Sequence, residues 1–290
     1  MNQDDPTAGA SDADILHAYW PLQVGSLRSL KTLGNGRRIL FAESPGGPVV
    51  AKLFRCDRPL AETTADVAAI RRAAEHGITR DIIATYDGSL LAAGAWGSGY
   101  LTPFVAGVHP PATTQRLRDL GDLLGRLHTT PAPDPRLRWH DAQRVAEIRE
   151  RCAHDDAPAW FQSAALILGP LPDCPLGFIH TDAFFNNCLE QADGTLVLID
   201  WDDAGTGPFV TDLAYVCACL SWNSPDCGDL ITAFASGYRP HRRVTAQEIA
   251  CLPRSMLFWM LLYADFARPD PGLLCQRILD HGEAWASLLS

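Results

Sequence analysis

One stretch constrains the fold more than any other, the run GFIHTDAFFNNCLEQADGTLVLIDWDDAGTGPFVTDLA at positions 177–214. Two apolar runs, Gly177–Ile179 and Leu196–Ile199, flank a polar loop and a turn at Asp193-Gly194, and acids follow each run at once. This pattern predicts a β-hairpin whose open end presents carboxylates on one side. An Asp-rich surface hairpin is the plain alternative, but a surface turn does not need an apolar run against each acid.

The polar residues of this stretch suit a divalent cation. His180, Asp182 and Asn187 have the spacing His-x-Asp-x4-Asn, and Asp200 directly follows the second apolar run. Carboxylate and amide oxygens are hard ligands, which Mg²⁺ shares with the phosphates of a substrate. The stretch therefore indicates a magnesium and phosphate site.

The ordered set of these residues resembles a known catalytic loop. It is similar to the catalytic loop and metal-binding Asp of the protein-kinase superfamily, and most similar to the aminoglycoside phosphotransferase and choline-kinase-like branch. In that branch the metal Asp is followed by Trp or Phe and a second acid, then by a Gly-Pro and an Asp-Leu-Ala segment. The matching residues here are Asp200-Trp201-Asp202, Gly207-Pro208 and Asp212-Leu213-Ala214.

The resemblance implies a fold and a set of roles. The fold is α+β, a two-lobed protein-kinase-like fold with a small antiparallel β N-lobe and a mostly helical C-lobe. Asp182 would align the acceptor hydroxyl, and Asn187 and Asp200 would hold Mg²⁺. His180 would keep the geometry of the loop, and Asp212 would hydrogen-bond the backbone beside it.

The N-terminal half contains the residues that the resemblance assigns to the nucleotide, ATP or GTP. In kinase-like families a Gly-containing hairpin covers the phosphates, and a lysine two strands further on contacts them. Gly34, Gly36 and Arg37 match the hairpin, and Lys52 matches the lysine. A lysine inside an apolar strand needs an anionic partner, although an edge-strand lysine is the alternative.

Two further nucleotide contacts follow from the resemblance. The families place a Glu in the next helix to pair with the lysine, and residues 60–76 read as that helix. This sequence has Asp66 at the matching position and Glu62 one turn earlier on the same face, so either acid is a candidate. Residues 99–105 resemble the hinge strand, where backbone groups around Thr102, Phe104 and Val105 would hold adenine.

The order of the expected elements sets the domain boundaries. Strand patterns and one helix fill residues 1–105, an N-terminal nucleotide-binding β lobe of which 1–12 are expected to be disordered. The strand patterns include a pair at residues 82–86 and 89–93. Residues 106–290 read as a helical C-terminal lobe with the catalytic loop and the acceptor site. Helical patterns there cover residues 113–128, 141–152, 159–168, 212–221, 229–238, 245–265 and 272–289.

Composition limits the partners. A net charge of −10 argues against nucleic acid, and no apolar run is long enough for a transmembrane helix. No secretion signal is visible, and the nine cysteines form no C-x2-C pair, so a cytoplasmic protein with reduced thiols and no zinc site is expected. Residues 106–290 carry 14 Lys/Arg and 23 Asp/Glu, which favours a cationic substrate by steering, with plain solubility as the alternative.

The acceptor pocket has no diagnostic motif. Its candidate residues, each with core packing or solubility as the alternative, are Asp202, Asp203, Phe184, Trp259 and Tyr263. The short segment between Asp200 and Asp212 leaves little room for a peptide substrate. We therefore expect an O-phosphotransferase, acting as a monomer or homodimer on a hydroxyl of an aminoglycoside-like or other cationic antibiotic.

Three alternatives stay open for this reaction. A metabolic kinase acting on choline, homoserine, thiamine or a sugar is nearly as well supported. A nucleotide-binding pseudokinase is disfavoured because Lys52, Asp182, Asn187 and Asp200 are all present. A metal-dependent hydrolase is disfavoured because the additional His ligands of such sites are absent from the pattern.

Overall fold

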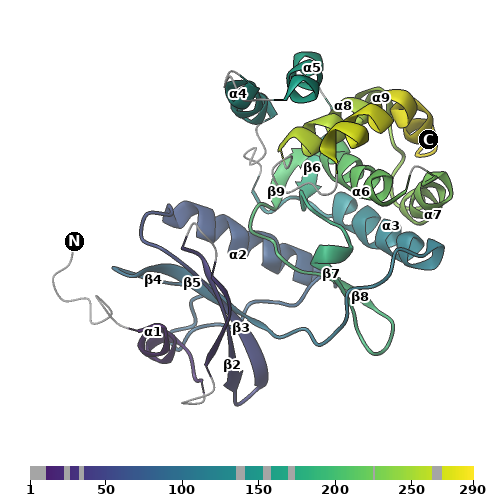
Figure 1. Cartoon of the computed structure of the whole chain (residues 1–290). Helices are drawn as coiled ribbons and strands as arrows, with labels where there is room; N and C mark the ends of the chain where they lie inside the picture. The colour runs from purple at the N-terminus through teal and green to yellow at the C-terminus, as the bar shows by residue number, and fades with distance from the viewer. Residues whose placement is uncertain are drawn as a thin grey trace. The chain divides into compact units, whose positions relative to one another are not determined.

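The computed structural model describes residues 11–22, 27–32, 36–134, 141–152, 158–168, 174–224, 226–262 and 270–290. The chain divides into two compact units, Met1–Gly107 and Val108–Ser290 (Figure 1). The first unit contains α1 (Asp12–Tyr19), β1 (Arg28–Thr32), β2 (Arg38–Ser44), β3 (Gly47–Phe54), α2 (Leu60–Glu75), β4 (Ala92–Gly94) and β5 (Gly97–Pro103). A strand-rich first unit with an antiparallel sheet, followed by a helical second unit, confirms the predicted α+β class.

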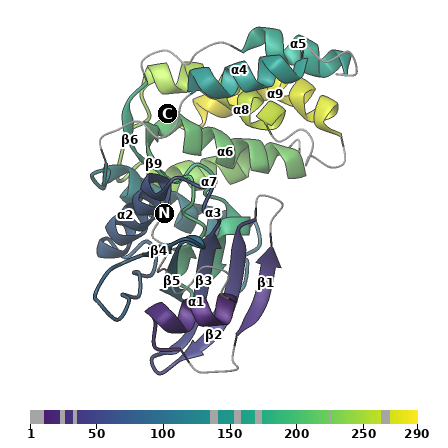
Figure 2. The same ribbon diagram turned by 90° about the vertical axis from the view of Figure 1, so that its left-hand side faces the viewer.

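The first unit is built on one antiparallel sheet with the strand order β1-β2-β3-β5-β4 (Figure 2). Helix α1 packs on one face, where Leu16 and Trp20 share a core with Ala51 and Leu53 of β3. Because side chains alternate along a strand, Lys52 points to the opposite face. Helix α2 covers that opposite face, since the hydroxyl of Thr63 lies 2.8 Å from the hydroxyl of Ser98 in β5.

Two predictions for this unit are wrong in part. Residues 11 and 12 are ordered rather than disordered, because the Ser11 side chain caps α1 and Asp14 bonds back to the Ser11 backbone in a capping box; residues 1–10 lie outside the described part. The expected strand pair at 82–86 and 89–93 is reduced to the short β4 and one bridge from Ile83. Hydrogen bonds inside the turn, from Thr85 to Asp87 and to the Ser89 carbonyl, compete with a longer ladder.

The second unit is mostly helical. Its helices are α3 (Thr114–Thr129), α4 (Asp141–Cys152), α5 (Ala159–Ile167), α6 (Phe209–Asn223), α7 (Gly228–Tyr238), α8 (Ala246–Leu262) and α9 (Pro271–Ser287). Helices α6, α8 and α9 lie side by side (Figure 2). Helices α3 and α7 touch backbone to backbone, because a Cβ added at Gly237 would lie 1.9 Å from the Arg118 carbonyl oxygen.

The hairpin predicted for the second unit is wrong in its first strand, whereas its turn at Asp193-Gly194 and its second strand are present. Strand β6 (Leu176–Ile179) pairs with β9 (Gly205–Pro208), and β7 (Cys188–Glu190) pairs with β8 (Leu196–Leu198). Both sheets are two-stranded and antiparallel. Strand β9 reads Gly-Thr-Gly-Pro, a composition of low β propensity that hides a strand in the sequence. The two apolar runs therefore belong to different sheets, which meet at the loop between β6 and β7.

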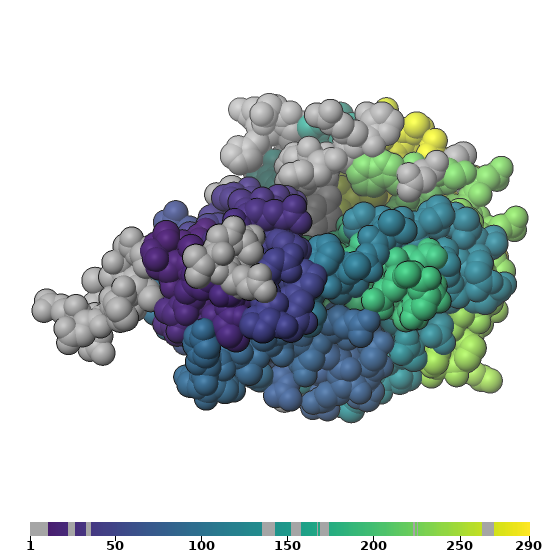
Figure 3. Space-filling model, turned by 90° about the horizontal axis from the view of Figure 1, so that it is seen from below, coloured from purple at the N-terminus to yellow at the C-terminus, as the bar shows by residue number. Residues whose placement is uncertain are grey.

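The β7–β8 hairpin is held against α3. In the space-filling view the green hairpin lies beside the teal helix (Figure 3). Arg116 of α3 forms ion pairs with Asp119 in its own helix and with Glu190 in β7. Among the described residues no helix is long and apolar enough to span a bilayer.

Candidate active site

The loop after β6 carries Asp182 and is closed by a short 3₁₀ helix, Phe185–Asn187. The side-chain amide of Asn187 donates to Asp182 Oδ2 over 2.6 Å and to the Asp182 carbonyl over 3.2 Å. The backbone N–H of Ile199 donates to the Asn187 carbonyl, which ties this loop to the end of β8. Asp182, Asn187 and the segment that contains Asp200 are therefore brought together, as the sequence predicted.

The Asp212 side chain holds the backbone at the start of this loop. It lies in the first turn of α6, is completely buried, and accepts the backbone N–H groups of His180 over 2.8 Å and of Thr181 over 2.6 Å. These are the contacts expected between Asp212 and the backbone beside His180. Its Oδ2 also accepts a third hydrogen bond, over 3.1 Å, from Nε2 of His128.

Backbone strain is found in this loop and at Asp200, the predicted metal ligand. Thr181 has a φ of 82° and Asp200 a φ of 64°, the left-handed region that L residues rarely occupy and β-branched residues avoid. Such strain persists only where surrounding bonds over-determine the backbone. The Asp212 carboxylate supplies that constraint at Thr181.

His180 is buried and positioned by the loop. Its Nε2 donates to the Ile199 carbonyl over 3.1 Å, and its Nδ1 lies 3.0 Å from Asp182 Oδ1 without the angles of a hydrogen bond. Burial opposes protonation, but the carboxylates of Asp182, Asp212 and Asp200 together raise the pKa of His180. The His180 ring therefore lies directly against the Asp182 carboxylate and is screened from solvent.

The acids of this site repel one another. Burial raises the pKa of Asp182, His180 opposes that rise, and the charges of Asp200 and Asp203 add to it. A bound cation would relieve this repulsion. With its amide N–H turned to Asp182, Asn187 has its Oδ1 left to bind a metal.

These residues fit a magnesium ion that is held jointly with phosphates. No group of three or more His, Cys, Asp or Glu side chains with metal-binding geometry occurs in the described ranges. Two protein oxygens completed by phosphate oxygens and water are the usual arrangement for Mg²⁺ at a phosphoryl-transfer site. Asn187 and Asp200 stay the predicted ligands.

In the first unit, Lys52 is on a central strand. It faces Ile39 in β2 and Tyr100 in β5, so the alternative of an edge-strand lysine is wrong. Helix α2 covers the same face of the sheet, and on it the Asp66 side chain is completely buried whereas Glu62 is 53% exposed. Asp66 is therefore the better candidate for the acid that accompanies Lys52.

Arg58 is a cation of this region that the sequence reasoning missed. Its guanidinium lies 2.7 Å from Asp66 Oδ2 and 3.1 Å from Glu62 Oε2, and it stacks 4.0 Å above the Phe54 ring. Phe54 is two residues from Lys52 and so on the same face of β3. The sequence did contain a signal for this contact. Arg58 precedes Pro59 at the start of a predicted helix, and acids follow it four and eight residues later, at 62 and 66.

Backbone hydrogen bonds of β5 limit which groups of the predicted hinge could contact adenine. The N–H of Phe104 donates to the Pro48 carbonyl over 2.9 Å, and Thr102 faces Val50 two residues further along the same ladder. Since ladder bonds alternate in an antiparallel pair, the backbone groups of Thr102 are engaged with β3. Pro48 has no N–H to return a bond to Phe104. The Phe104 N–H is therefore excluded as a donor to adenine, and the Phe104 carbonyl and the backbone of Val105 are left as candidates.

The glycine turn is described only in part. Gly36 has a φ of 77°, and an added Cβ would lie 2.1 Å from Cδ of Arg55, so the turn needs glycine there. Arg37 directly follows it and is half-buried. Gly34 lies outside the described residues, and so does Tyr263.

The predicted acceptor residues separate into buried and accessible ones. Trp259 is 2% exposed and donates its indole N–H to the Thr211 carbonyl, which corrects its assignment to an acceptor wall in favour of core packing. Phe184 is also buried, with its ring 5.0 Å from that of Phe185. Asp202 is buried, and Asp203 is exposed.

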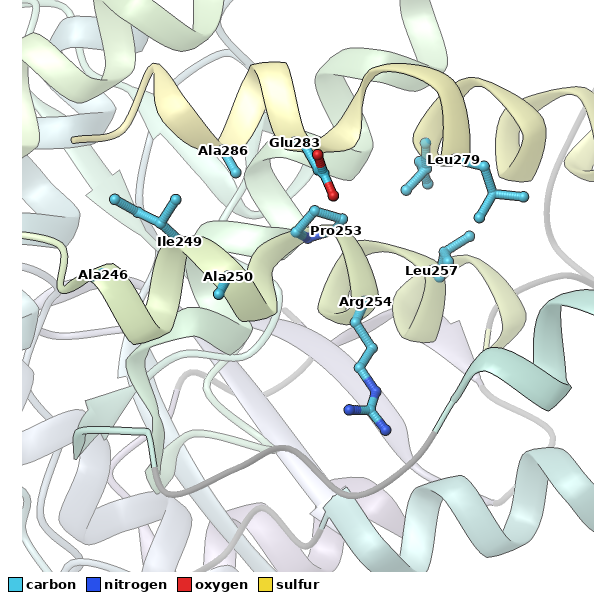
Figure 4. Close-up of a pocket in the computed structure, with 10 residues that line it drawn as sticks. Ala246, Ile249, Ala250, Pro253, Arg254, Leu257, Leu279, Glu283 and Ala286 are labelled. Carbon is cyan, nitrogen blue, oxygen red and sulfur yellow. The ribbon is translucent and has the colours of Figure 1, made fainter.

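A cavity of about 530 Å³ lies between α8 and α9 (Figure 4). Its lining is mainly apolar, from residues such as Ile249, Leu257 and Leu279. None of the predicted catalytic, metal or acceptor residues lines it. We therefore do not assign it to the acceptor.

Residues 32–247 match the model of a phosphotransferase enzyme family. The chain belongs to the phosphotransferase enzyme family. This phosphotransferase is 28% identical over 193 residues to a homoserine kinase of Methylobacterium radiotolerans, covering 60% of each chain. It thus spans about 60% or less of the length of the curated relatives that it matches.

Solved structures share the fold of the phosphotransferase. An amicoumacin kinase in complex with AMP-PNP, Ca²⁺ and Ami has a TM-score of 0.71 at 15% identity, with 94% of both chains covered. A spectinomycin phosphotransferase in complex with ADP and spectinomycin has a TM-score of 0.62 at 14% identity, with 96% of both chains covered. At this identity the likeness shows the kinase-like fold alone.

Proposed function

We propose that the chain is an ATP-dependent O-phosphotransferase acting on a hydroxyl of a small, amine-bearing molecule. The leading acceptor is an aminoglycoside-like or other cationic antibiotic, which gives the protein a cytoplasmic role in resistance or self-protection. The observation that carries the proposal is the loop in which Asn187 holds Asp182 over 2.6 Å while Asp212 fixes the strained backbone before it. That arrangement presents one carboxylate in a fixed direction beside a second acid, Asp200.

Each residue of this site has one task in the proposal. Asp182 accepts a hydrogen bond from the acceptor hydroxyl and aligns its oxygen for in-line attack on the γ-phosphorus. Asn187 and Asp200 hold Mg²⁺, which neutralises phosphate charge when it is bound. In the first unit, Lys52 contacts the α- and β-phosphates. Positioning and charge neutralisation supply most of the catalysis in such transfers.

The nucleotide assignment favours ATP over GTP. Two structures that share the fold contain adenine nucleotides, AMP-PNP in one and ADP in the other. The first unit contributes Lys52, Gly36, Arg37 and the backbone of Val105 to nucleotide binding. We place the acceptor with the second unit.

The acceptor class rests on charge. The second unit contains 14 Lys/Arg and 23 Asp/Glu, and Asp203 is exposed close enough to Asp182 to raise the pKa of that carboxyl. Exposed acids beside the transfer site favour an ammonium group on the acceptor. A metabolic kinase is the second candidate, and the homoserine kinase relatives support it. Homoserine, like the proposed antibiotic, carries both an ammonium group and a hydroxyl.

Nucleoside diphosphate release in a coupled assay tests the proposal. The assay contains ATP or GTP, Mg²⁺, and a panel of amino sugars, peptide antibiotics, nucleosides, choline and homoserine. We expect one amine-bearing acceptor to stimulate release with ATP, and Asp182→Ala to abolish the stimulation while nucleotide affinity stays within about twofold. Asp193→Ala, which removes an exposed acid in the β7–β8 turn, is the matched control.

The outcomes separate the candidates. Stimulation by homoserine alone would replace the antibiotic reading with the metabolic one. An Asp182→Ala variant that loses nucleotide affinity as strongly as turnover would contradict the division of roles. Absence of stimulation by every acceptor, with full nucleotide binding, would favour a non-catalytic nucleotide-binding protein.

A further inference from the structure

A hydrogen-bonded series of buried and partly buried polar side chains leads from Glu248 in α8 to Asp212. Nδ1 of His128 lies 2.7 Å from the Tyr238 hydroxyl, and Nη1 of Arg242 lies 3.2 Å from the same hydroxyl. Nη2 of Arg242 contacts both carboxylate oxygens of Glu248, over 2.8 and 2.9 Å. With the bond from His128 to Asp212, four consecutive links join Glu248 to the carboxylate under the catalytic loop.

Chemistry allows only one direction of hydrogen bonding along this chain. A guanidinium has donors and no acceptor, so the Tyr238 oxygen accepts from Arg242. A carboxylate has no proton to donate, so Nε2 of His128 carries the proton of its bond to Asp212. Burial lowers the pKa of His128, and the Asp212 carboxylate only partly opposes this, so the ring is neutral. A neutral ring with its proton on Nε2 accepts at Nδ1, and the Tyr238 hydroxyl is the donor there.

The Glu248 end of this hydrogen-bonded series is anchored by further contacts. Glu248 is completely buried and forms a capping box with Thr245, whose N–H and hydroxyl both donate to Oε2 of Glu248. The Arg242 guanidinium also lies 4.2 Å from the centre of the Phe209 ring, and the centre of that ring lies 4.7 Å from the centre of the His128 ring. The hydrogen-bonded path and this stacked path therefore both end at His128.

We propose that Tyr238 and Arg242 are positioning residues that fix the Nε2–H tautomer of His128 and so hold Asp212 in place under the catalytic loop. The inference deepens the proposed function and rests on it for its effect on turnover. Asp212 in turn holds the His180 and Thr181 amides, and the strained backbone of Thr181 sets the direction of Asp182. A small displacement of a catalytic group lowers turnover by up to about 100-fold.

The tautomer is tested without any activity. Proton–nitrogen correlation spectra of ¹⁵N-histidine-labelled protein show which ring nitrogen carries the proton, and the His128→Gln spectrum identifies the His128 signals. We expect the proton on Nε2 in the wild type and a second tautomer in Tyr238→Phe, which removes the donor to Nδ1. A proton on Nδ1 in the wild type would overturn the proposal, even if every variant failed to fold.

Turnover separates positioning from mere stability. Acceptor-free Mg-ATP hydrolysis, and transfer to any acceptor found active, are measured at a temperature where all the variants are folded. We expect Tyr238→Phe and Arg242→Met to lower kcat about 10- to 100-fold with KM for ATP within about twofold. Arg242→Lys keeps a cationic donor and should recover most of the loss, and Tyr86→Phe, at an exposed tyrosine, should match the wild type.

The two ways of failing are distinct. A wild type without hydrolysis or transfer would refute the proposed function and leave the tautomer result to stand alone. An active wild type whose Tyr238→Phe variant keeps both kcat and the tautomer would refute the positioning role. Equal losses in Arg242→Met and Arg242→Lys would also refute it, because they would show that packing rather than the donor matters.

Discussion

Replacing Asp212 by asparagine removes one carboxylate oxygen from a completely buried site and leaves its shape unchanged. With the remaining oxygen toward the His180 amide and His128, the new NH₂ group faces the Thr181 N–H across the present 2.6 Å. Two donors then meet where a charge-assisted hydrogen bond existed. The variant therefore tests whether charge at this point holds the loop.

The magnitude follows from those contacts. A hydrogen bond to a charged group contributes about 1.5–3 kcal/mol, and a buried N–H left unsatisfied costs about 1–3 kcal/mol. Asp212→Asn should thus destabilise the second unit by about 2.5–6 kcal/mol. The Thr181 backbone, at a φ of 82°, should also relax, because the bond that constrains it is lost.

Urea unfolding followed by tryptophan fluorescence measures the loss of stability, and hydrogen exchange of residues 176–184 measures the local effect. Asp229→Asn is the matched control, since Asp229 also lies in the first turn of a helix but is exposed. Its replacement should cost no more than about 1 kcal/mol. An Asp212→Asn variant within about 1 kcal/mol of the wild type, with unchanged exchange at the loop, would refute the reasoning.

Three further outcomes are expected. Arg58→Met removes the guanidinium 2.7 Å from the fully buried Asp66 carboxylate, so the unfolding free energy should fall by about 3 kcal/mol; an unchanged urea midpoint would contradict this. Burial lowers the pKa of His128 from its ordinary 6.5, so only the unfolded chain takes up that proton. The unfolding free energy of the wild type should therefore fall as the pH drops below 6.5. Melting temperatures of His128→Gln should fall less over the same pH range than those of the wild type. Lys52→Met should raise KM for ATP at least about 10-fold with an unchanged melting temperature, whereas an unchanged KM would remove Lys52 from the nucleotide site.

Local sequence was sufficient for most elements of this chain. The helices from 60 to 75 and from 114 to 129 were predicted to within a residue at each end. Each has a continuous helical pattern, with a Gly after one helix and a Thr before the other marking a boundary. Such signals depend only on residues one or two turns away. The fold class and the loop residues Asp182 and Asn187 were also readable, because their spacing is short and their chemistry is specific.

Strand pairing was not readable in the second unit. The apolar runs before Asp182 and before Asp200 were predicted to pair with each other, but each pairs with a different strand. Partners of a strand are chosen by contacts that are distant in sequence, and Gly205–Pro208 has no local signal for pairing with Leu176–Ile179. The sequence located the acids correctly but assigned the wrong scaffold to them.

The sequence by itself determined which chemistry this protein carries: a lysine in a buried strand, a His-x-Asp-x4-Asn loop and an acid after an apolar run. Only the tertiary structure decided how these residues are held. Arg58 beside Asp66, and Tyr238 and Arg242 behind His128, are partners that no spacing rule connects to the site. Burial makes an unpaired polar group costly, so the fold must supply a partner for each one, and that partner comes from whichever element lies nearest in space.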